Sequence, residues 1–130
     1  MYSFSDRSRK KLSTCHPQLQ GLFNEIIKHH DCSILCGHRS EEDQNDAFSK
    51  NLSKLEYPNS KHNRLASRAV DVVPYPIDWN DRERFVYFAG LVKGVAIQMG
   101  IGIRWNGDWD SDNDLKDQNF MDLPHFELSP

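Results

Sequence analysis

The sequence predicts an α+β fold in which helices pack on a small antiparallel sheet. Segments with helical spacing of apolar residues occur early and midway along the 130 residues, while the segments typical of strands are short and scattered. No internal repeat or Gly/Ser-rich linker divides the chain. We therefore expect a single domain that spans residues 1–130.

Three helices are expected in the first half of the chain. Ser5 caps a helix from Asp6 to about Ser13. Pro17 suits the first turn of a second helix, whose apolar residues repeat at helical spacing and form one buried stripe: Leu19, Leu22, Phe23, Ile26 and Ile27. Ser40 precedes three acidic residues and begins a third helix, which runs to about Leu52.

The second half alternates strands with one long helix. Asn80 caps that helix, which covers Asp81 to Met99 with Met99 on its core face, and Gly100 ends it. The expected strands are Cys32–Cys36, Ala69–Val73, Ile101–Trp105 and His125–Leu128. A polar, irregular segment covers residues 53–68, and a loop of that length is typically functional or disordered.

The charge and the distribution of apolar residues argue against several classes of protein. The formal net charge is −3, which argues against a general nucleic-acid binder. No apolar run reaches the length of a membrane span, and the first residues lack the apolar core of a signal peptide. Cys32, Ile34 and Cys36 alternate along a strand, so we interpret these cysteines as buried free thiols rather than half of a zinc site.

One carboxylate stands out because Asp71 lies between Val70 and Val72 in an apolar strand, where it is costly to bury unpaired. His62 precedes this strand, and His125 lies on the last strand, on the same face as Glu127. Two histidines and a carboxylate with an open fourth position form a catalytic zinc pattern. From spacing alone, ordinary structural roles for these histidines stay open.

Two further residues have chemistry that suits such a site. Asp122 comes shortly before His125 and could serve as a general base. Arg39 follows a strand, and a fixed guanidinium there could stabilise a developing oxyanion. The alternatives are that Asp122 caps a turn and that Arg39 pairs with the acidic residues of the next helix.

Taken together, these residues resemble a known family. The matching segments are Cys36–Ser40 with Gln44 and Phe48, Ser60–His62 leading to Ala69–Asp71, Trp105–Trp109, and Asp122–Leu128. In this order they resemble the VanY-type (D-alanyl-D-alanine-carboxypeptidase-like) zinc peptidases. Within that group the chain is most similar to the bacteriophage L-alanyl-D-glutamate endopeptidases, which are endolysins. One departure is the longer stretch between His62 and Asp71, which lacks the family's glycine.

The resemblance implies a fold of the LAS/hedgehog zinc peptidase type and hydrolysis of the L-alanyl-D-glutamate bond of peptidoglycan stem peptides, which lyses bacteria. It implies Zn²⁺ bound by His62, Asp71 and His125. It implies Asp122 as the base, where other members carry Glu, and Arg39 as the residue that steadies the tetrahedral intermediate. Ser60 would support the zinc-binding histidine.

Contacts to the substrate are also expected. Trp105, Trp109 and Tyr57 are candidate walls of the groove, although core packing is the alternative for the tryptophans. Lys61 is a candidate partner of the acidic stem peptide, together with Arg64 and Arg68.

An acidic loop covers residues 106–122 and carries Asp108, Asp110, Asp112, Asp114 and Asp117. The alternating carboxylates resemble the start of an EF-hand loop, without its central Gly and terminal Glu. Some related phage endopeptidases are calcium-regulated, so Ca²⁺ is a candidate regulator; the alternative is a solvated acidic loop.

The family reading also predicts partners and location. We expect a monomer that binds peptidoglycan and has no nucleic-acid partner and no stable membrane association. It would be made in the host cytoplasm and act in the periplasm or cell wall once the membrane is permeabilised. The alternative functions are a D,D- or L,D-carboxypeptidase on the same scaffold, or a non-catalytic zinc-containing module that binds the cell wall.

Overall fold

A four-stranded antiparallel sheet forms the centre of the computed structural model, which describes residues 2–105 and 123–129. The strand order is β1-β2-β4-β3. The strands are β1 Cys32–Cys36, β2 Ala69–Pro74, β3 Ile103–Trp105 and β4 His125–Leu128. The C-terminal strand therefore lies inside the sheet, between β2 and β3.

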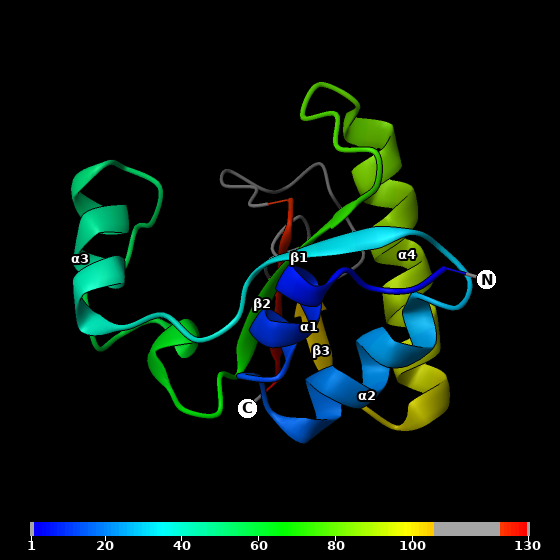
Figure 1. The fold of residues 1–130 in the computed structure, drawn as a ribbon, viewed down its shortest axis with the longest axis horizontal. Coiled ribbons are helices and arrows are strands. Elements are labelled where there is room, and N and C mark those ends of the chain that lie inside the picture. Colours follow the sequence, from blue (N-terminus) through cyan, green and yellow to red (C-terminus); the bar gives the residue numbers. More distant parts are fainter. Residues whose placement is uncertain (1, 106–122, 130) are drawn as a thin grey trace.

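The helices are α1 Asp6–Leu12, α2 Pro17–Ile26, α3 Glu41–Ser49 and α4 Arg82–Met99, with a short 3₁₀ helix η1 at Lys61–Asn63. Figure 1 shows α3 apart from α1, α2 and α4, joined to the sheet by the segments on either side of it. The predicted α+β class is confirmed. No helix in the described part of the chain combines the length and apolarity needed to span a bilayer.

Most helix ends agree with the prediction. The Ser5 side chain accepts a hydrogen bond from the Ser8 amide, and Gly100 ends α4 in the left-handed region with φ +71°. The predicted cap of α4 is wrong by one position, because Asp81, not Asn80, accepts from the Arg84 amide. The third helix ends at Ser49, before the predicted Leu52.

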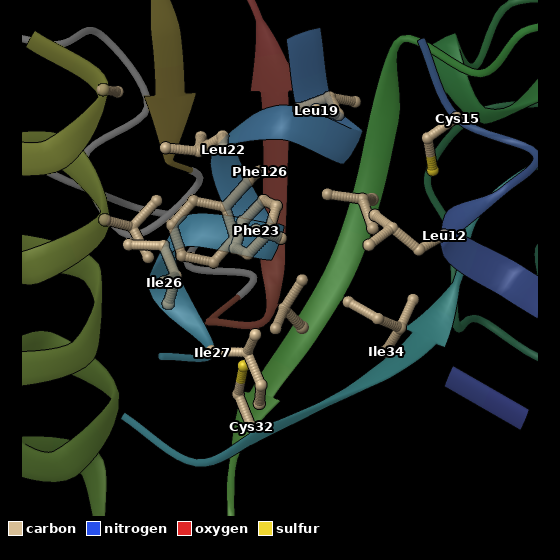
Figure 2. Packing of buried hydrophobic residues seen from close by; sticks show 14 of the residues in the cluster. Leu12, Cys15, Leu19, Leu22, Phe23, Ile26, Ile27, Cys32, Ile34 and Phe126 are labelled. Carbon is tan, nitrogen blue, oxygen red and sulfur yellow. The ribbon is translucent and has the colours of Figure 1, made fainter. Parts of the chain in front are cut away.

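The hydrophobic core lies between the sheet and the helices α2 and α4. Figure 2 shows Phe126 of β4 facing Phe23 of α2, and their ring centroids are 5.7 Å apart. Phe88 of α4 packs against the same Phe126 ring, and the centroids of these two rings are 6.2 Å apart. The prediction that Met99 faces this core is wrong, because Met99 occupies the last turn of α4 and is 43% exposed.

Strand alternation directs the polar residues of β2 and β4 away from this core. Val70, Val72 and Phe126 join the hydrophobic core, so the residues between them face the other side of the sheet. There the ladder pairs Asp71 with His125, because these two residues are direct partners in neighbouring strands. The β3–β4 ladder pairs Arg104 with Glu127 on the same face.

An irregularity in β1 changes the direction of one side chain. The β1–β2 register shifts between Ile34 and Cys36, so Ile34 is opposite Val72 whereas Cys36 is opposite Asp71. The expectation that Cys36 shares a face with Cys32 and Ile34 is therefore wrong. A bulge adds a residue to one strand and redirects the side chains that follow it.

Gly37, directly after β1, has no room for a side chain. A Cβ atom there would lie 2.3 Å from the Lys11 carbonyl oxygen and 2.4 Å from Thr14 Oγ1. We expect Gly37→Ala to lower the free energy of unfolding by about 1–3 kcal/mol, measured by urea denaturation, because overpacking forces the backbone to shift.

Gly90→Ala is the matched control, because a Cβ at Gly90 meets nothing within 4 Å. This substitution in α4 should raise the free energy of unfolding by about 0.5–1 kcal/mol. Equal stability of the two variants would contradict the proposed crowding at Gly37.

Candidate metal centre

His62 is held in the site by the local structure of η1. The Ser60 hydroxyl accepts a hydrogen bond from the His62 amide, and the Asn63 side chain accepts one from the Ser60 amide, which completes a capping box. The His62 carbonyl accepts a bond from the Arg39 amide at 2.7 Å. His62 is thereby buried, with 2% of its surface exposed.

Three donor atoms from separate elements converge on the sheet face away from the helical core. His62 Nε2 lies 3.2 Å from Asp71 Oδ1 and 3.2 Å from His125 Nδ1. His125 Nδ1 lies 3.1 Å from Asp71 Oδ1, which closes the triangle. The structure thus brings together His62, Asp71 and His125, three residues that are far apart in the sequence.

The second nitrogen of each histidine has its own partner. His62 Nδ1 donates to the Gly37 carbonyl at 2.7 Å, and His125 Nε2 lies 2.9 Å from Glu127 Oε1. When each ring is neutral, His62 carries its proton on Nδ1 and His125 carries its proton on Nε2. The other ring nitrogen, which faces Asp71, then has a free lone pair. This arrangement is typical of histidines that bind metals.

The donor set and its spacing suit zinc. Zinc binds histidine nitrogen and carboxylate oxygen at about 2.0–2.1 Å in tetrahedral sites, which places neighbouring donors about 3.3 Å apart. The separations of 3.1–3.2 Å in the His62–Asp71–His125 triangle are close to this value.

A second, overlapping donor set includes a thiol. The donor atoms of Cys36, His62 and Asp71 all lie within 4.8 Å of one another, a group that could hold a metal ion. Thiolates also bind zinc, at a longer bond length of about 2.3 Å. The cluster therefore offers more donors than one three-residue site needs.

The charges of these groups depend strongly on one another. Burial alone would lower the pKa of His62, but the Asp71 carboxylate outweighs this effect and raises that pKa to about 10. Burial would raise the pKa of Asp71, yet the neighbouring His62 charge and the hydrogen bonds from both histidines hold it well below its usual range. The pKa of His125 is raised, because hydrogen bonds to Asp71 and Glu127 oppose the effect of burial. These buried carboxylates favour positive charge, which protons or a metal cation can supply.

Arg39 borders the cluster, and its side chain is held on the α3 side. Its Nη2 lies 3.6 Å from Asp71 Oδ2, and its Nη1 donates to Gln44 Oε1 at 2.9 Å. Gln44 is fully buried and also donates to Ser53 Oγ at 2.9 Å, so it links Arg39 to the loop after α3. The alternative for Arg39, a pairing with the acidic residues at the start of α3, is not among its contacts in the described residues.

Three predicted site residues, Trp105, Lys61 and Ser60, are buried or have partners within the protein. Trp105 is only 3% exposed, and its Nε1 donates to the Leu123 carbonyl, so the core-packing alternative replaces the groove wall for this residue. The Lys61 ammonium binds Glu127 Oε2 at 2.9 Å and the Leu128 carbonyl at 2.8 Å, so it has intramolecular partners. Ser60 is buried and acts as the cap of η1.

Several predicted residues lie outside the described part of the chain. These are the proposed base Asp122, the aromatic candidate Trp109, and the calcium candidates Asp108, Asp110, Asp112 and Asp114. Their roles stay predictions.

Three residues in or beside the cluster had no assigned role in the sequence prediction. For Cys36 the sequence predicts a buried thiol and no role in the site, and the register shift in β1 turns it toward Asp71. Gln44 was part of a matching segment without a function. Glu127 was placed on the same strand face as His125, and this alternation was a usable signal for its contact with the imidazole.

Comparisons with known proteins agree with this geometry. The family model described as "Phage L-alanyl-D-glutamate peptidase" matches residues 1–129. The L-alanyl-D-glutamate peptidase of Escherichia phage T5 is 29% identical over 135 residues, which cover 98% of this chain and 98% of that protein. The crystal structure of the Serratia marcescens L-Ala D-Glu endopeptidase ChiX is similar with a TM-score of 0.77 and 26% identity, and the match covers 98% of this chain and 90% of the other.

The hydrogen bonds of Gln44 generate a stability prediction. Gln44→Ala should lower the free energy of unfolding by about 1–3 kcal/mol, because it leaves buried polar partners unsatisfied. Thermal and urea denaturation measure this change. Gln98→Ala is the control, since Gln98 is exposed on α4. If both variants are as stable as the parent protein, the Gln44 network does not stabilise the fold.

Proposed function

The chain belongs to the phage L-alanyl-D-glutamate peptidase family, and on this premise we propose that it is a zinc-dependent endolysin that hydrolyses the L-alanyl-D-glutamate bond of peptidoglycan stem peptides. It is a peptidase, as its family and relatives indicate. We further place it among the VanY-type zinc peptidases, an assignment supported by its histidine and aspartate donors.

The convergence of His62, Asp71 and His125 carries the zinc part of the proposal. Their donor atoms are 3.1–3.2 Å apart, and the outer nitrogen of each histidine has a hydrogen-bond partner. These three residues would hold the ion and leave a coordination position open. When bound, zinc supplies the Lewis acidity that polarises the scissile carbonyl and makes a water molecule more acidic.

The chain's own residues supply the rest of the chemistry. Arg39 lies beside Asp71, where its guanidinium would stabilise negative charge on the carbonyl oxygen as water attacks. Asp122 would accept the proton of the attacking water and pass it to the departing D-glutamate amine. A donor such as Arg39 acts best when its position is fixed beforehand, and the bond to Gln44 supports that requirement.

The location and partners belong to the same proposal. The enzyme would be made in the host cytoplasm and reach the peptidoglycan after the membrane is permeabilised. A monomer and a role for calcium at the acidic loop remain predictions. A D,D- or L,D-carboxypeptidase on the same scaffold is the main alternative, and it differs in the bond that is cut.

Product analysis tests the reaction. Mass spectrometry of muropeptides digested by the enzyme should show disaccharide-linked L-alanine and a released peptide that begins with D-glutamate. Chelation should abolish both products, and added zinc should restore them. Loss of a terminal D-alanine without these products would support the carboxypeptidase instead.

Asp122→Ala tests the base in the same assay. We expect product formation to fall by at least about 100-fold, the lower range for general acid–base catalysis, while bound zinc is retained. Asp46→Ala is the control, because Asp46 is an exposed residue of α3 paired with Lys50. Unchanged turnover in the Asp122 variant would remove that residue from the base role.

The two overlapping donor sets can be separated by metal binding. The shorter distances favour the His62–Asp71–His125 set, so His125→Ala should lose most bound zinc after dialysis, whereas Cys36→Ser should retain it. Cobalt substitution offers an independent readout, since a thiolate ligand gives an intense near-ultraviolet absorption band. That band in the parent protein, together with zinc loss in Cys36→Ser, would favour the set that contains Cys36.

A further inference from the structure

Glu127 is a buried carboxylate whose two oxygens have different partners. The residue is 4% exposed. Its Oε1 lies 2.9 Å from His125 Nε2. Its Oε2 receives the Lys61 ammonium at 2.9 Å and Arg104 Nη2 at 2.8 Å. One oxygen is thus engaged by two cations, and the other is left for the imidazole.

This division follows from where the partners lie in the fold. Arg104 is directly opposite Glu127 in the β3–β4 ladder, so the strand register delivers its guanidinium. Lys61 belongs to η1 and is the residue before His62. The two cations compensate the cost of burying a carboxylate, and the imidazole occupies its remaining oxygen.

The same contacts tie η1 to β4. The Lys61 ammonium also donates to the Leu128 carbonyl at 2.8 Å, and the Lys61 carbonyl accepts from the Arg68 amide at 3.1 Å. The Arg68 carbonyl in turn accepts from the Leu128 amide at 2.9 Å. The segment that carries His62 is therefore fastened to the strand that carries His125.

We propose that Glu127 is a positioning residue of the metal centre, which holds His125 in the tautomer and orientation that present Nδ1 to the metal. The inference rests on the proposed zinc site. With Oε2 engaged by Lys61 and Arg104, Oε1 accepts the Nε2–H of His125. The Nδ1 lone pair then faces His62 Nε2 and Asp71 Oδ1, which lie 3.2 and 3.1 Å away.

A glutamine cannot reproduce this arrangement. If its amide nitrogen faces His125, it donates to Nε2 and moves the ring proton to Nδ1, which removes the metal-binding lone pair. If its amide nitrogen faces Lys61 and Arg104 instead, the amide NH₂ group lies against an ammonium and a guanidinium, which are also hydrogen-bond donors and cannot accept from it. Either orientation weakens the site although the volume of the side chain is unchanged.

Zinc affinity in Glu127→Gln, measured by competition with a chromophoric chelator, is the direct test. We expect a dissociation constant about 10–100-fold higher than that of the parent protein, as for other partners of metal-binding histidines. Glu25→Gln is the control for the same chemical change at a partly exposed residue of α2, and it should bind zinc as the parent does. Lys61→Met keeps the carboxylate and should lower zinc affinity less than Glu127→Gln does.

Imidazole ¹⁵N spectra of the zinc-loaded parent protein provide a readout that a merely structural role would not move. They should show His125 bound through Nδ1, with a proton on Nε2. Coordination through Nε2 would overturn the proposal even if Glu127→Gln failed to fold. Parent-like zinc affinity in a folded Glu127→Gln variant would also overturn it.

These outcomes are distinct from a failure of the proposed function. If the parent protein binds no zinc, or if His62→Ala binds it equally well, the zinc site itself is wrong. If the parent protein binds zinc through His62 and Glu127→Gln binds it equally well, the zinc site is supported and only the positioning role of Glu127 is refuted.

Discussion

The placement of Asp71 within the sheet, where its side chain is only 16% exposed, is the constraint on which the rest of the structure depends. A carboxylate in an apolar strand needs compensating partners, and three side chains provide them: His62, His125 and Arg39. His125 reaches Asp71 only because β4 enters the sheet beside β2 with these residues opposite each other. His62 reaches it only because η1 is capped by Ser60 and bonded to the turn after β1.

Because of this constraint, one face of the sheet is apolar and the other carries charged groups. Phe23 and Phe126 pack together on the face covered by α2 and α4 (Figure 2), and Phe88 of α4 contacts Phe126 there. These rings bury apolar area that stabilises the fold. The opposite face is left for charged groups, which neutralise one another in short networks. Such networks are costly to bury when incomplete, so the loss of one partner affects the others. Lys61, which is predicted to meet a substrate, belongs to one of these networks through its contact with Glu127.

Local signals made much of the fold predictable. Periodic apolar residues and caps such as Ser5 and Gly100 depend on near neighbours, and the helices and strands they predict agree with the structure to within a few residues. The errors have local causes as well. Asp81 rather than Asn80 caps α4, since both residue types suit that role. Trp105 is in the core because an indole can bury its ring while its N–H meets a carbonyl.

The amino-acid sequence by itself determined the residue types of the site and the order in which they occur, because a buried carboxylate and histidines near strands are visible without coordinates. It also determined that His125 and Glu127 share one face of β4, since strand alternation is a local rule. Only the tertiary structure decided which residues meet. The register shift that turns Cys36 toward Asp71 and the contact of Lys61 with Glu127 both join distant segments. Such contacts depend on strand pairing and packing across the whole chain, which no local pattern specifies.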